Sequence, residues 1–529
     1  MTVAECIAEE LGKRGVRYLF GIPGGPSIPY LVELKRQGIE FILTANETAA
    51  GIMADVTGRI TGLPGVCHAT FGPGATNLST GVGGALLDRS PLIALTTEVP
   101  DNMRKRTIQM NIDHQLLFEP VTKATVRLSP RNCIDIMTDA FDLAESEYPG
   151  PVHIGLPSDI ANRKIGKPSN SYLTEEWDQE TYVDSEVAAL LEYSKKPVLA
   201  VGLTASRHSM GPEIKQFLDQ HPMPVLLTPM AKGLIPRDHE YYAGVLFHAM
   251  SDKLTGLIEE SDLVIGFGYD PVEYNYESWL PDIPLIHINT IPSDMPPGIM
   301  VKQVHGRLEG ILEMLSPALN KESKWNFKHL SEIRIIMQSS LETRKRSFGP
   351  VKMLKTLREV CPPETILTLD VGSHIHLFGQ FWDVPSKEKL IMTNGWSGMG
   401  FGIPSAIAAK LNKPECPVVC VTGDGGFLMM SGEIITARRL GINIVIVVLS
   451  DGELNLIKLK QQKWELEPYG ISLYNGDLFG AEIFLGIPVL NVNSITGMRI
   501  SVKRALNSKG PVIINAVIDP SEYQDLIVV

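Results

Sequence analysis

The stretch VVCVTGDGGFLMMSGE, residues 418–433, decides the fold class of this 529-residue chain. An apolar run typical of a buried parallel strand ends in Gly-Asp-Gly-Gly, and a helix-like segment follows. Glycines at the carboxyl end of such a strand let the backbone approach a phosphate closely. An acid beside phosphates needs a cation between them, so Asp424 indicates a bridging Mg²⁺.

A second acid stands in the same kind of position. The segment INIVIVVLSDGEL, residues 442–454, is another apolar run, and it ends in Ser450-Asp451. Asp451 follows Asp424 by about one helix plus one strand, a spacing that returns a parallel chain to the same sheet edge. Either segment alone suits a tight turn equally well or better. The pair at this spacing favours a shared metal ion.

Apolar runs and helix-like stretches alternate along the rest of the chain, which predicts parallel sheets covered on both faces. A polar linker is expected at 169–186, and a charged, helix-prone stretch at 321–346. These divide the chain into three α/β units, so we predict three doubly wound parallel-sheet domains. The strand-like runs are 18–20, 41–43, 66–69 and 92–96, then 196–202, 223–229, 262–268 and 283–289, then 364–372, 416–426, 442–452 and 510–519.

Composition limits the class of protein. Hydrophobic residues make up 44% and charged residues 20%, which is ordinary for a globular protein. The net charge of −12 argues against a nucleic-acid partner, whose phosphates require a basic surface. No window is apolar enough to span a membrane, and the N-terminus lacks signal-peptide features, so a cytoplasmic location is expected. The 6 scattered cysteines predict buried thiols, without a disulfide framework or a zinc site.

Two further features lie near the N-terminus. Glu47 stands where an apolar run meets a helix-like stretch, in ILTANETAAGIMADVTGR (42–59). A Gly-Pro-Gly turn opens toward a helix in ATFGPGATNLSTGV (69–82). Alone, Glu47 is best explained as an acid in a first helical turn after Asn46, and the Gly-Pro-Gly segment as a turn with an N-cap.

In their order along the chain, these features resemble thiamine-diphosphate enzymes, and specifically the acetolactate synthase group. The resemblance spans nearly the whole sequence. It rests on FGIPGG (20–25), the Glu47 segment, TFGPGATN (70–77), PVTKAT (120–125), GPVHIGLPSDI (150–160), KGLIP (232–236), GYDPVEY (268–274), NGWSGMGFGIPSAIAA (394–409) and GDGGF (423–427).

The resemblance implies a pyrimidine-binding domain at 1–165, a central domain at 185–330 and a diphosphate-binding domain at 345–529. It implies thiamine diphosphate and Mg²⁺ as cofactors and a small 2-keto acid as substrate. Members of the family form their active site between the first domain of one subunit and the third of another. A homodimer or homotetramer is therefore expected.

The resemblance also assigns roles to single residues. Glu47 matches the glutamate that hydrogen-bonds the cofactor's pyrimidine ring, and Met399 the apolar residue that props the cofactor in its bent shape. The carbonyl of Ser397 would face the cofactor's amino group. Asp424 and Asp451, with the carbonyl of Glu453, would bind Mg²⁺. The remaining cofactor contacts would come from Gly372, Ser373, His374, Gly423, Gly425, Gly426 and Phe427.

The chain departs from the usual pattern in several places. Ser450-Asp451 replaces the usual Asn pair or Asn-Asp, Asn46-Glu47 replaces His-Glu, and Glu98 stands where many members have Gln. His68 stands where synthases tend to have an apolar residue, and it resembles an active-site histidine of benzoylformate-decarboxylase-like members. A histidine at a strand end is, on general grounds, more often structural. GYDPVEY resembles the flavin-free catabolic synthases, so FAD is not expected.

These implications lead to one leading hypothesis and three alternatives. The leading one is a carboligase that decarboxylates a pyruvate-like 2-keto acid and condenses the resulting enamine with a second keto acid. A non-ligating 2-keto-acid decarboxylase is the first alternative, and His68 is the residue in its favour. A non-catalytic cofactor-binding protein is the second, and intact Glu47, Met399 and Asp424 count against it. A flavin-dependent oxidase is the third.

Overall fold

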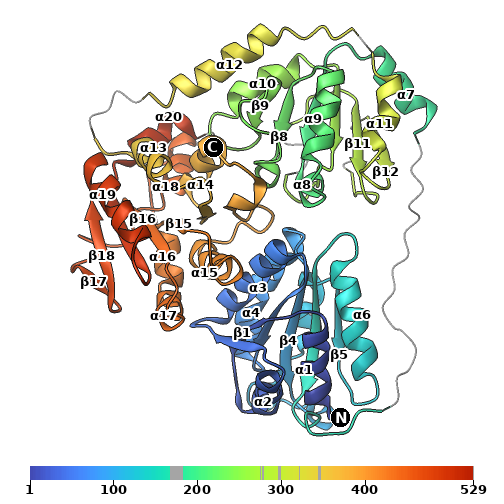
Figure 1. Ribbon diagram of the computed structural model, residues 1–529, viewed down its shortest axis with the longest axis vertical. Helices are drawn as coiled ribbons and strands as arrows, with labels where there is room; N and C mark the ends of the chain where they lie inside the picture. Colours follow the sequence, from blue (N-terminus) through green and yellow to red (C-terminus); the bar gives the residue numbers. More distant parts are fainter. Residues whose placement is uncertain are drawn as a thin grey trace.

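The protein consists of three α/β domains, each built on one sheet, as the alternating pattern predicts (Figure 1). The computed structural model describes residues 1–166, 183–274, 276, 279–295, 300–320, 322–342 and 347–527. Most of the linker predicted at 169–186 lies outside these residues. Its last two residues belong instead to a helix, α7 (Ser185–Tyr193).

The N-terminal domain has six parallel strands in the order β2-β1-β3-β4-β6-β5. The strands are β1 (Tyr18–Ile22), β2 (Glu40–Leu43), β3 (Gly65–Ala69), β4 (Leu92–Glu98), β5 (Ala124–Arg127) and β6 (Pro151–Pro157). The helices are α1 (Val3–Lys13), α2 (Ile28–Arg36), α3 (Glu47–Thr61), α4 (Pro73–Leu87), α5 (His114–Phe118) and α6 (Cys133–Glu145).

Alternation along the strands sends side chains to two different cores. Leu92 and Ala94 of β4 pack with α3 and α4, whereas Ile93 and Leu95 pack with α1, α2 and α6. Side chains two residues apart on a strand share one face of the sheet. The side on which a residue of these strands lies therefore follows from its position.

The described residues of the central domain also form six parallel strands, in the order β12-β11-β10-β7-β8-β9. They are β7 (Pro197–Val201), β8 (Val225–Leu227), β9 (Tyr242–Val245), β10 (Leu263–Phe267), β11 (Leu285–Asn289) and β12 (Val301–His305). The helices are α7, α8 (Leu203–Arg207), α9 (Gly211–Gln220), α10 (Asp252–Glu259) and α11 (Ile311–Leu315), and α12 (Phe327–Ser339) leads out of the domain. Within its described residues, 322–342, the helix-prone stretch at 321–346 thus contains one helix of 13 residues.

The C-terminal sheet has the order β14-β13-β15-β16-β19-β18-β17, with only β17 antiparallel to its neighbour. The strands are β13 (Ile366–Leu369), β14 (Leu390–Ile391), β15 (Val418–Gly423), β16 (Val445–Ser450), β17 (Ile483–Phe484), β18 (Ile487–Val492) and β19 (Val512–Val517). The helices are α13 (Pro350–Val360), α14 (Ser373–Phe381), α15 (Gly402–Asn412), α16 (Asp424–Met430), α17 (Glu433–Arg439), α18 (Asn455–Lys463), α19 (Ile495–Leu506) and α20 (Tyr523–Leu526).

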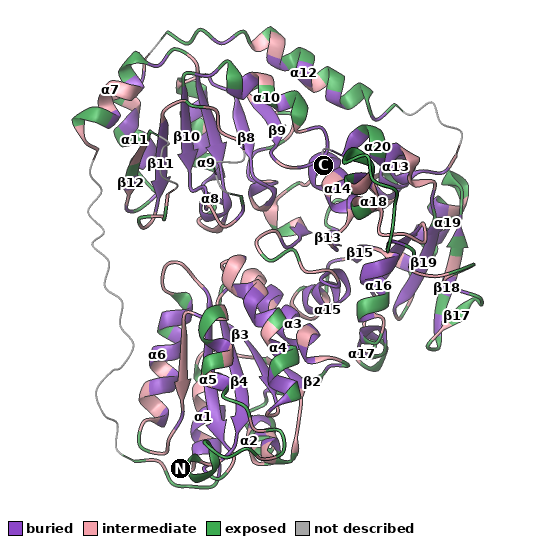
Figure 2. Ribbon diagram, turned by 180° about the vertical axis from the view of Figure 1, so that it is seen from behind, coloured by how far each residue is buried: buried purple, intermediate pink, exposed green. Residues whose placement is uncertain are grey.

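The N-terminal and C-terminal domains share one buried core. Helix α3 packs against α15, and the apolar side chains of both belong to a single cluster, which appears as adjoining buried ribbon in Figure 2. Buried polar contacts join the same domains: Asp88, which pairs with Arg59 inside the N-terminal domain, accepts the N–H groups of Asn394 and Gly395 at 3.1 and 2.9 Å. The two domains therefore pack as one unit within the chain.

Two expectations from composition can be compared with the fold. All six cysteines are buried and remain free thiols, as predicted. Among the described residues, no helix combines the length and the apolar character needed to cross a membrane.

Candidate active site

The predicted metal- and phosphate-binding residues meet at one edge of the C-terminal sheet. Strand β15 lies between β13 and β16, and all three run parallel. Their carboxyl ends therefore bring three segments together: 370–374 after β13, 423–427 at the end of β15, and 450–453 after β16. Open α/β sheets bind their ligands at this edge.

The two acids lie next to each other at this sheet edge. One carboxylate oxygen of Asp424 accepts the N–H groups of Asp451 and Gly452 at 3.2 and 2.7 Å, and the hydroxyl of Tyr474 donates to the same oxygen at 3.0 Å. Burial, and then the charge of Asp424, raises the pKa of Asp451 to about 7. Asp424 is buried and Asp451 half-buried. Two neighbouring carboxylates that repel each other are stabilised by a divalent cation between them, so this donor set fits Mg²⁺.

Glu453 contributes differently from these acids. Its side chain forms an ion pair with Lys458 at 2.6 Å, and its N–H donates to Asp451 at 3.2 Å. The carboxylate therefore already has a cationic partner, and the main-chain carbonyl is the group of Glu453 that the resemblance implies as a metal ligand.

Two buried polar atoms lie unused at the start of α14. Among the described residues, neither the hydroxyl of Ser373 nor Nε2 of His374 has a hydrogen-bond partner. A Cβ added to Gly423 would lie 3.6 Å from the His374 ring, so this ring lies beside the Gly-Asp-Gly turn. Burying a polar group without a partner is costly. Both atoms are therefore suited to bind a ligand such as a diphosphate.

Glu47 is the first residue of α3, and the side chain of Asn46 caps this helix by accepting the N–H of Thr48 at 2.7 Å. The Glu47 side chain is 8% exposed, and Asn77 on α4 donates to its Oε2 at 3.1 Å. Its other oxygen lies 3.2 Å from the position of a Cβ on Gly74. The Gly-Pro-Gly turn thus leads α4 directly against the Glu47 carboxylate.

Models of the thiamine pyrophosphate enzyme family match all three parts of the chain: the N-terminal TPP-binding domain at residues 1–117, the central domain at 185–315 and the C-terminal TPP-binding domain at 370–516. The large subunit of acetolactate synthase isozyme 2 of Escherichia coli is 30% identical, covering 99% of this chain and 96% of that protein. The chain belongs to the thiamine pyrophosphate enzyme family. It is therefore a thiamine-pyrophosphate-dependent enzyme of the acetolactate synthase-like group.

Two further relatives are also similar to this chain over nearly their whole length. The acetolactate synthase of Bacillus subtilis is 29% identical over 99% of this chain and 94% of its own length. The catabolic acetolactate synthase of Raoultella terrigena is 28% identical over 99% of this chain and 95% of its own length. The similarity to these acetolactate synthases therefore covers nearly the whole of each chain rather than a single shared domain.

Asp370 is a residue of this thiamine pyrophosphate enzyme that sequence reasoning missed. It is fully buried after β13, and its carboxylate accepts the N–H groups of Gly400 and Gly402 at 2.8 and 3.0 Å. It thereby fixes the loop that carries Met399, whose methyl group lies 2.9 Å from the position of a Cβ on Gly425. The signal that could have found it is an acid directly after an apolar strand, in TLDVGSH.

Ser397 and Phe427 differ in how they can take part. Ser397 has a φ of 51°, a left-handed conformation that costs a non-glycine residue about 1–3 kcal/mol and is typical of functional sites. Phe427 is fully buried and packs against Phe479 and Phe484, with ring centroids 5.1 and 5.5 Å away. The Phe427 side chain is thus a core residue, and only its backbone can contact a ligand.

His68 does not join the group around Glu47. It follows Val66 on β3 by two residues and so lies on the face covered by α1 and α2, whereas Glu47 lies with α3 and α4. Its Nε2 is 2.7 Å from the hydroxyl of Ser27, and burial lowers the pKa of this imidazole to about 4. Its packing and hydrogen bond are those of a structural histidine.

Proposed function

We propose that this thiamine-pyrophosphate-dependent enzyme is a Mg²⁺-requiring carboligase that decarboxylates a pyruvate-like 2-keto acid and joins the product to a second keto acid. The observation that carries the proposal is that one chain contains two groups of residues, each suited to bind one part of the cofactor. Glu47 is held by Asn77 in the N-terminal domain. Near the Asp424–Asp451 pair in the C-terminal domain, the Ser373 hydroxyl and Nε2 of His374 have no hydrogen-bond partner among the residues that the structure describes.

Bound thiamine diphosphate supplies a carbon nucleophile and an electron sink for the decarboxylation of keto acids. The protein's own part is to bind and orient the cofactor and to move a proton. Asp424, Asp451 and the carbonyl of Glu453 would hold Mg²⁺, and Ser373, His374, Gly425 and Gly426 would contact the diphosphate. The donors at Gly372 and Gly423 and the backbone of Phe427 complete this group.

The second part of the protein's role is to place the thiamine end. Met399 and the carbonyl of Ser397 set its position, and the carboxyl group of Glu47 holds a proton against the pyrimidine ring. Asn77 fixes one oxygen of Glu47, which leaves the other oxygen for the cofactor. A positioned carboxyl group that shares a proton is the requirement of general acid–base catalysis.

The proposal includes the assembly and the domain limits 1–165, 185–330 and 345–529. We propose a homodimer or homotetramer whose site lies between subunits. In support, three large apolar side chains beside the candidate site are exposed in the single chain: Trp396 by 40%, Leu428 by 44% and Met429 by 57%. Exposed apolar groups gathered around a site are typical of an interface. Light scattering of the purified protein tests this part.

The proposed enzyme works without FAD. Doubly wound sheets bind nucleotides at the carboxyl ends of their strands. In the central domain, the carboxylate of Glu273 lies there and accepts the N–H of Leu203 at the start of α8, at 2.8 Å. Tyr269 and Tyr276 stack beside it with ring centroids 4.4 Å apart. An acid that already uses this backbone donor disfavours a dinucleotide phosphate at the same place.

The geometry favours ligation over simple decarboxylation because it weakens the case for the decarboxylase. The decarboxylase alternative depends on His68, whose side chain lies on the other face of the sheet from Glu47. The relatives' names give the positive support, since those proteins are acetolactate synthases.

The test is incubation of the purified protein with thiamine diphosphate, Mg²⁺ and pyruvate, with products identified by NMR. We expect acetolactate, and we expect Glu47→Gln to abolish it while cofactor binding persists, because the amide cannot share the proton. Acetaldehyde as the sole product would establish the decarboxylase instead. Normal turnover by Glu47→Gln would contradict the role of Glu47.

A further inference from the structure

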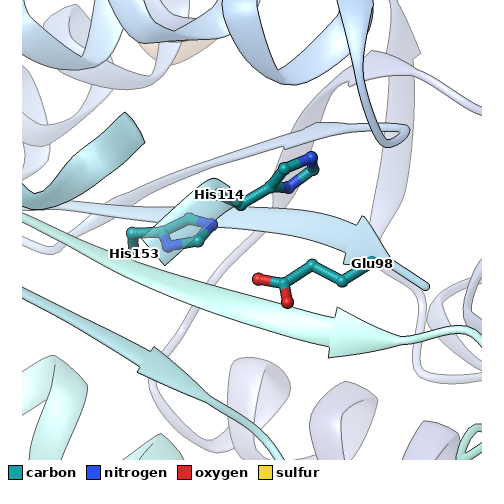
Figure 3. A group of neighbouring side chains, drawn as sticks. All are labelled: Glu98, His114 and His153. Carbon is teal, nitrogen blue, oxygen red and sulfur yellow. The ribbon is translucent and has the colours of Figure 1, made fainter. Parts of the chain in front are cut away.

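A chain of buried hydrogen bonds crosses the N-terminal domain beside the Gly-Pro-Gly turn. Figure 3 shows three of the side chains involved, His114 from α5, His153 from β6 and Glu98 from the end of β4, lying close together. All three are at most 5% exposed, and their ligand atoms lie within 4.8 Å of one another. Such a group can in principle hold a metal ion.

The partners of these side chains favour a hydrogen-bonded chain over a metal site. Both ring nitrogens of His114 and both of His153 already have protein partners. Glu98 forms an ion pair with Arg127 and accepts the amide of Gln115 at 2.6 Å. A cation at this place would displace several hydrogen bonds and would be repelled by the adjacent guanidinium.

The direction of every proton in the first half of the chain follows from one fixed donor. The N–H of Gly72 can only donate, so Nε2 of His114, at 3.2 Å, must accept. The neutral ring then carries its proton on Nδ1 and donates to the Thr96 hydroxyl at 2.9 Å. Thr96 in turn donates its only proton to Nε2 of His153 at 2.8 Å.

The second half continues in the same direction. Nδ1 of His153 donates to the Thr125 hydroxyl at 2.6 Å, and that hydroxyl donates to the Gln115 oxygen at 2.9 Å. The Gln115 amide then donates to Glu98. Burial lowers the pKa of His114 to about 4 and that of His153 well below its usual value, which keeps both rings neutral.

This chain of hydrogen bonds begins at the N–H of Gly72, a position whose backbone conformation and surroundings only glycine fits. Gly72 has a φ of 71°, and a Cβ there would lie 2.7 Å from the carbonyl oxygen of Met110. Gly72 is the N-cap of α4, and the first turns of α4 place Gly74 and Asn77 against Glu47. By holding Gly72, His114 therefore helps to fix the start of α4 and, with it, the surroundings of the Glu47 carboxylate.

We infer that His114 is a positioning residue for the reaction: its Nε2 holds the Gly72 N–H and so fixes the start of α4 against Glu47. This inference rests on the proposed function, because it assumes that Glu47 acts on the cofactor. His114 touches neither Glu47 nor the predicted metal and diphosphate residues, and its effect is indirect. Thr96 and His153 support it by fixing the tautomer of its ring.

Two variants of His114 separate this role from simple packing. His114→Gln keeps an acceptor that reaches the Gly72 N–H, whereas His114→Asn keeps only a donor near Thr96. We expect kcat to fall about tenfold or more in His114→Asn, the effect of one lost positioning hydrogen bond, with KM nearly unchanged. His114→Gln should restore most of kcat. Thr96→Val and Thr96→Ser form a second pair, in which only Ser keeps the hydroxyl.

Hydrogen exchange of the Gly72 amide gives a readout that needs no turnover. The amide should exchange faster in His114→Asn than in His114→Gln, at comparable thermal stability of the two variants. Equal exchange in the two variants, or equal kcat, overturns the inference. If the wild-type protein converts no 2-keto acid, the proposed function fails, and the exchange rates still decide whether His114 holds Gly72.

Discussion

Replacing Gly426 by alanine should damage the site through Asp370. A Cβ on Gly426 would lie 2.7 Å from both Cγ and Oδ1 of Asp370 and 2.8 Å from Oδ2, closer than real Cβ atoms approach. The carboxylate must move, and it then releases the N–H groups of Gly400 and Gly402. Overpacking costs about 1–3 kcal/mol, and each of the two buried N–H groups left without a partner adds about as much, so we expect a loss of about 3 kcal/mol or more in unfolding free energy.

The same movement should weaken cofactor binding, because Met399 lies on the released loop next to Gly400. Urea unfolding measures the stability, and calorimetric titration with thiamine diphosphate measures the affinity. The matched control is Gly256→Ala, an identical change in α10 where nothing lies within 4 Å of the new methyl group. It should stabilise the protein by about 0.5–1 kcal/mol, as glycine-to-alanine changes inside helices do. If Gly426→Ala behaves like this control in both assays, the role given to Asp370 is refuted.

Three other changes test the site and its surroundings. Asp424→Asn should lower the affinity for Mg²⁺ by about tenfold or more, since one of two charges is lost; unchanged affinity by calorimetry would count against the metal site. The free energy of unfolding should fall as pH decreases from about 6.5 toward 4. In this range His114 and His153 take up protons in the unfolded chain but stay neutral in the folded protein, where burial lowers their pKa. The loss is up to about 1.4 kcal/mol per pH unit for each ring. A flat profile, or one unaltered by His114→Gln, would contradict this. The purified protein should be colourless; a yellow protein with a flavin spectrum would overturn the placement of Glu273.

The strand ends of the C-terminal domain are predictable because their geometry is a property of parallel sheets. An apolar run ending in glycines or an acid specifies its own location, since the carboxyl ends of neighbouring parallel strands share one edge. The spacing of Asp424 and Asp451 along the chain is therefore enough to predict that they lie together. The three-domain α/β fold follows from the same alternation of runs and helices.

The residues that were missed all depend on contacts between distant segments. Tyr474 donates to Asp424, Asn77 donates to Glu47, and Asp370 accepts from the loop at 400–402. Tyr474 and Asn77 are ordinary residue types in their local context, so the sequence offers little reason to single them out, whereas Asp370 has its place after an apolar strand as a signal. His68 shows the complementary difficulty: alternation gives the two sides of β3, but only the packed helices show which side faces Glu47.

The contacts of Glu433 bear on how the two halves of the site are held. This buried carboxylate, at the start of α17, accepts the N–H groups of Ala45 and Asn46 at 2.8 and 2.9 Å, directly before Glu47. The C-terminal domain thus anchors the start of α3, the helix that carries Glu47, in its own chain. Helix α16, immediately before α17, instead leaves Leu428 and Met429 exposed. In the proposed dimer, the two consecutive helices would contact two different N-terminal domains. A substitution of Glu433 would therefore affect both active sites of the dimer. The segment formed by α16 and α17 anchors Glu47 of its own chain and also borders the site that the partner chain completes.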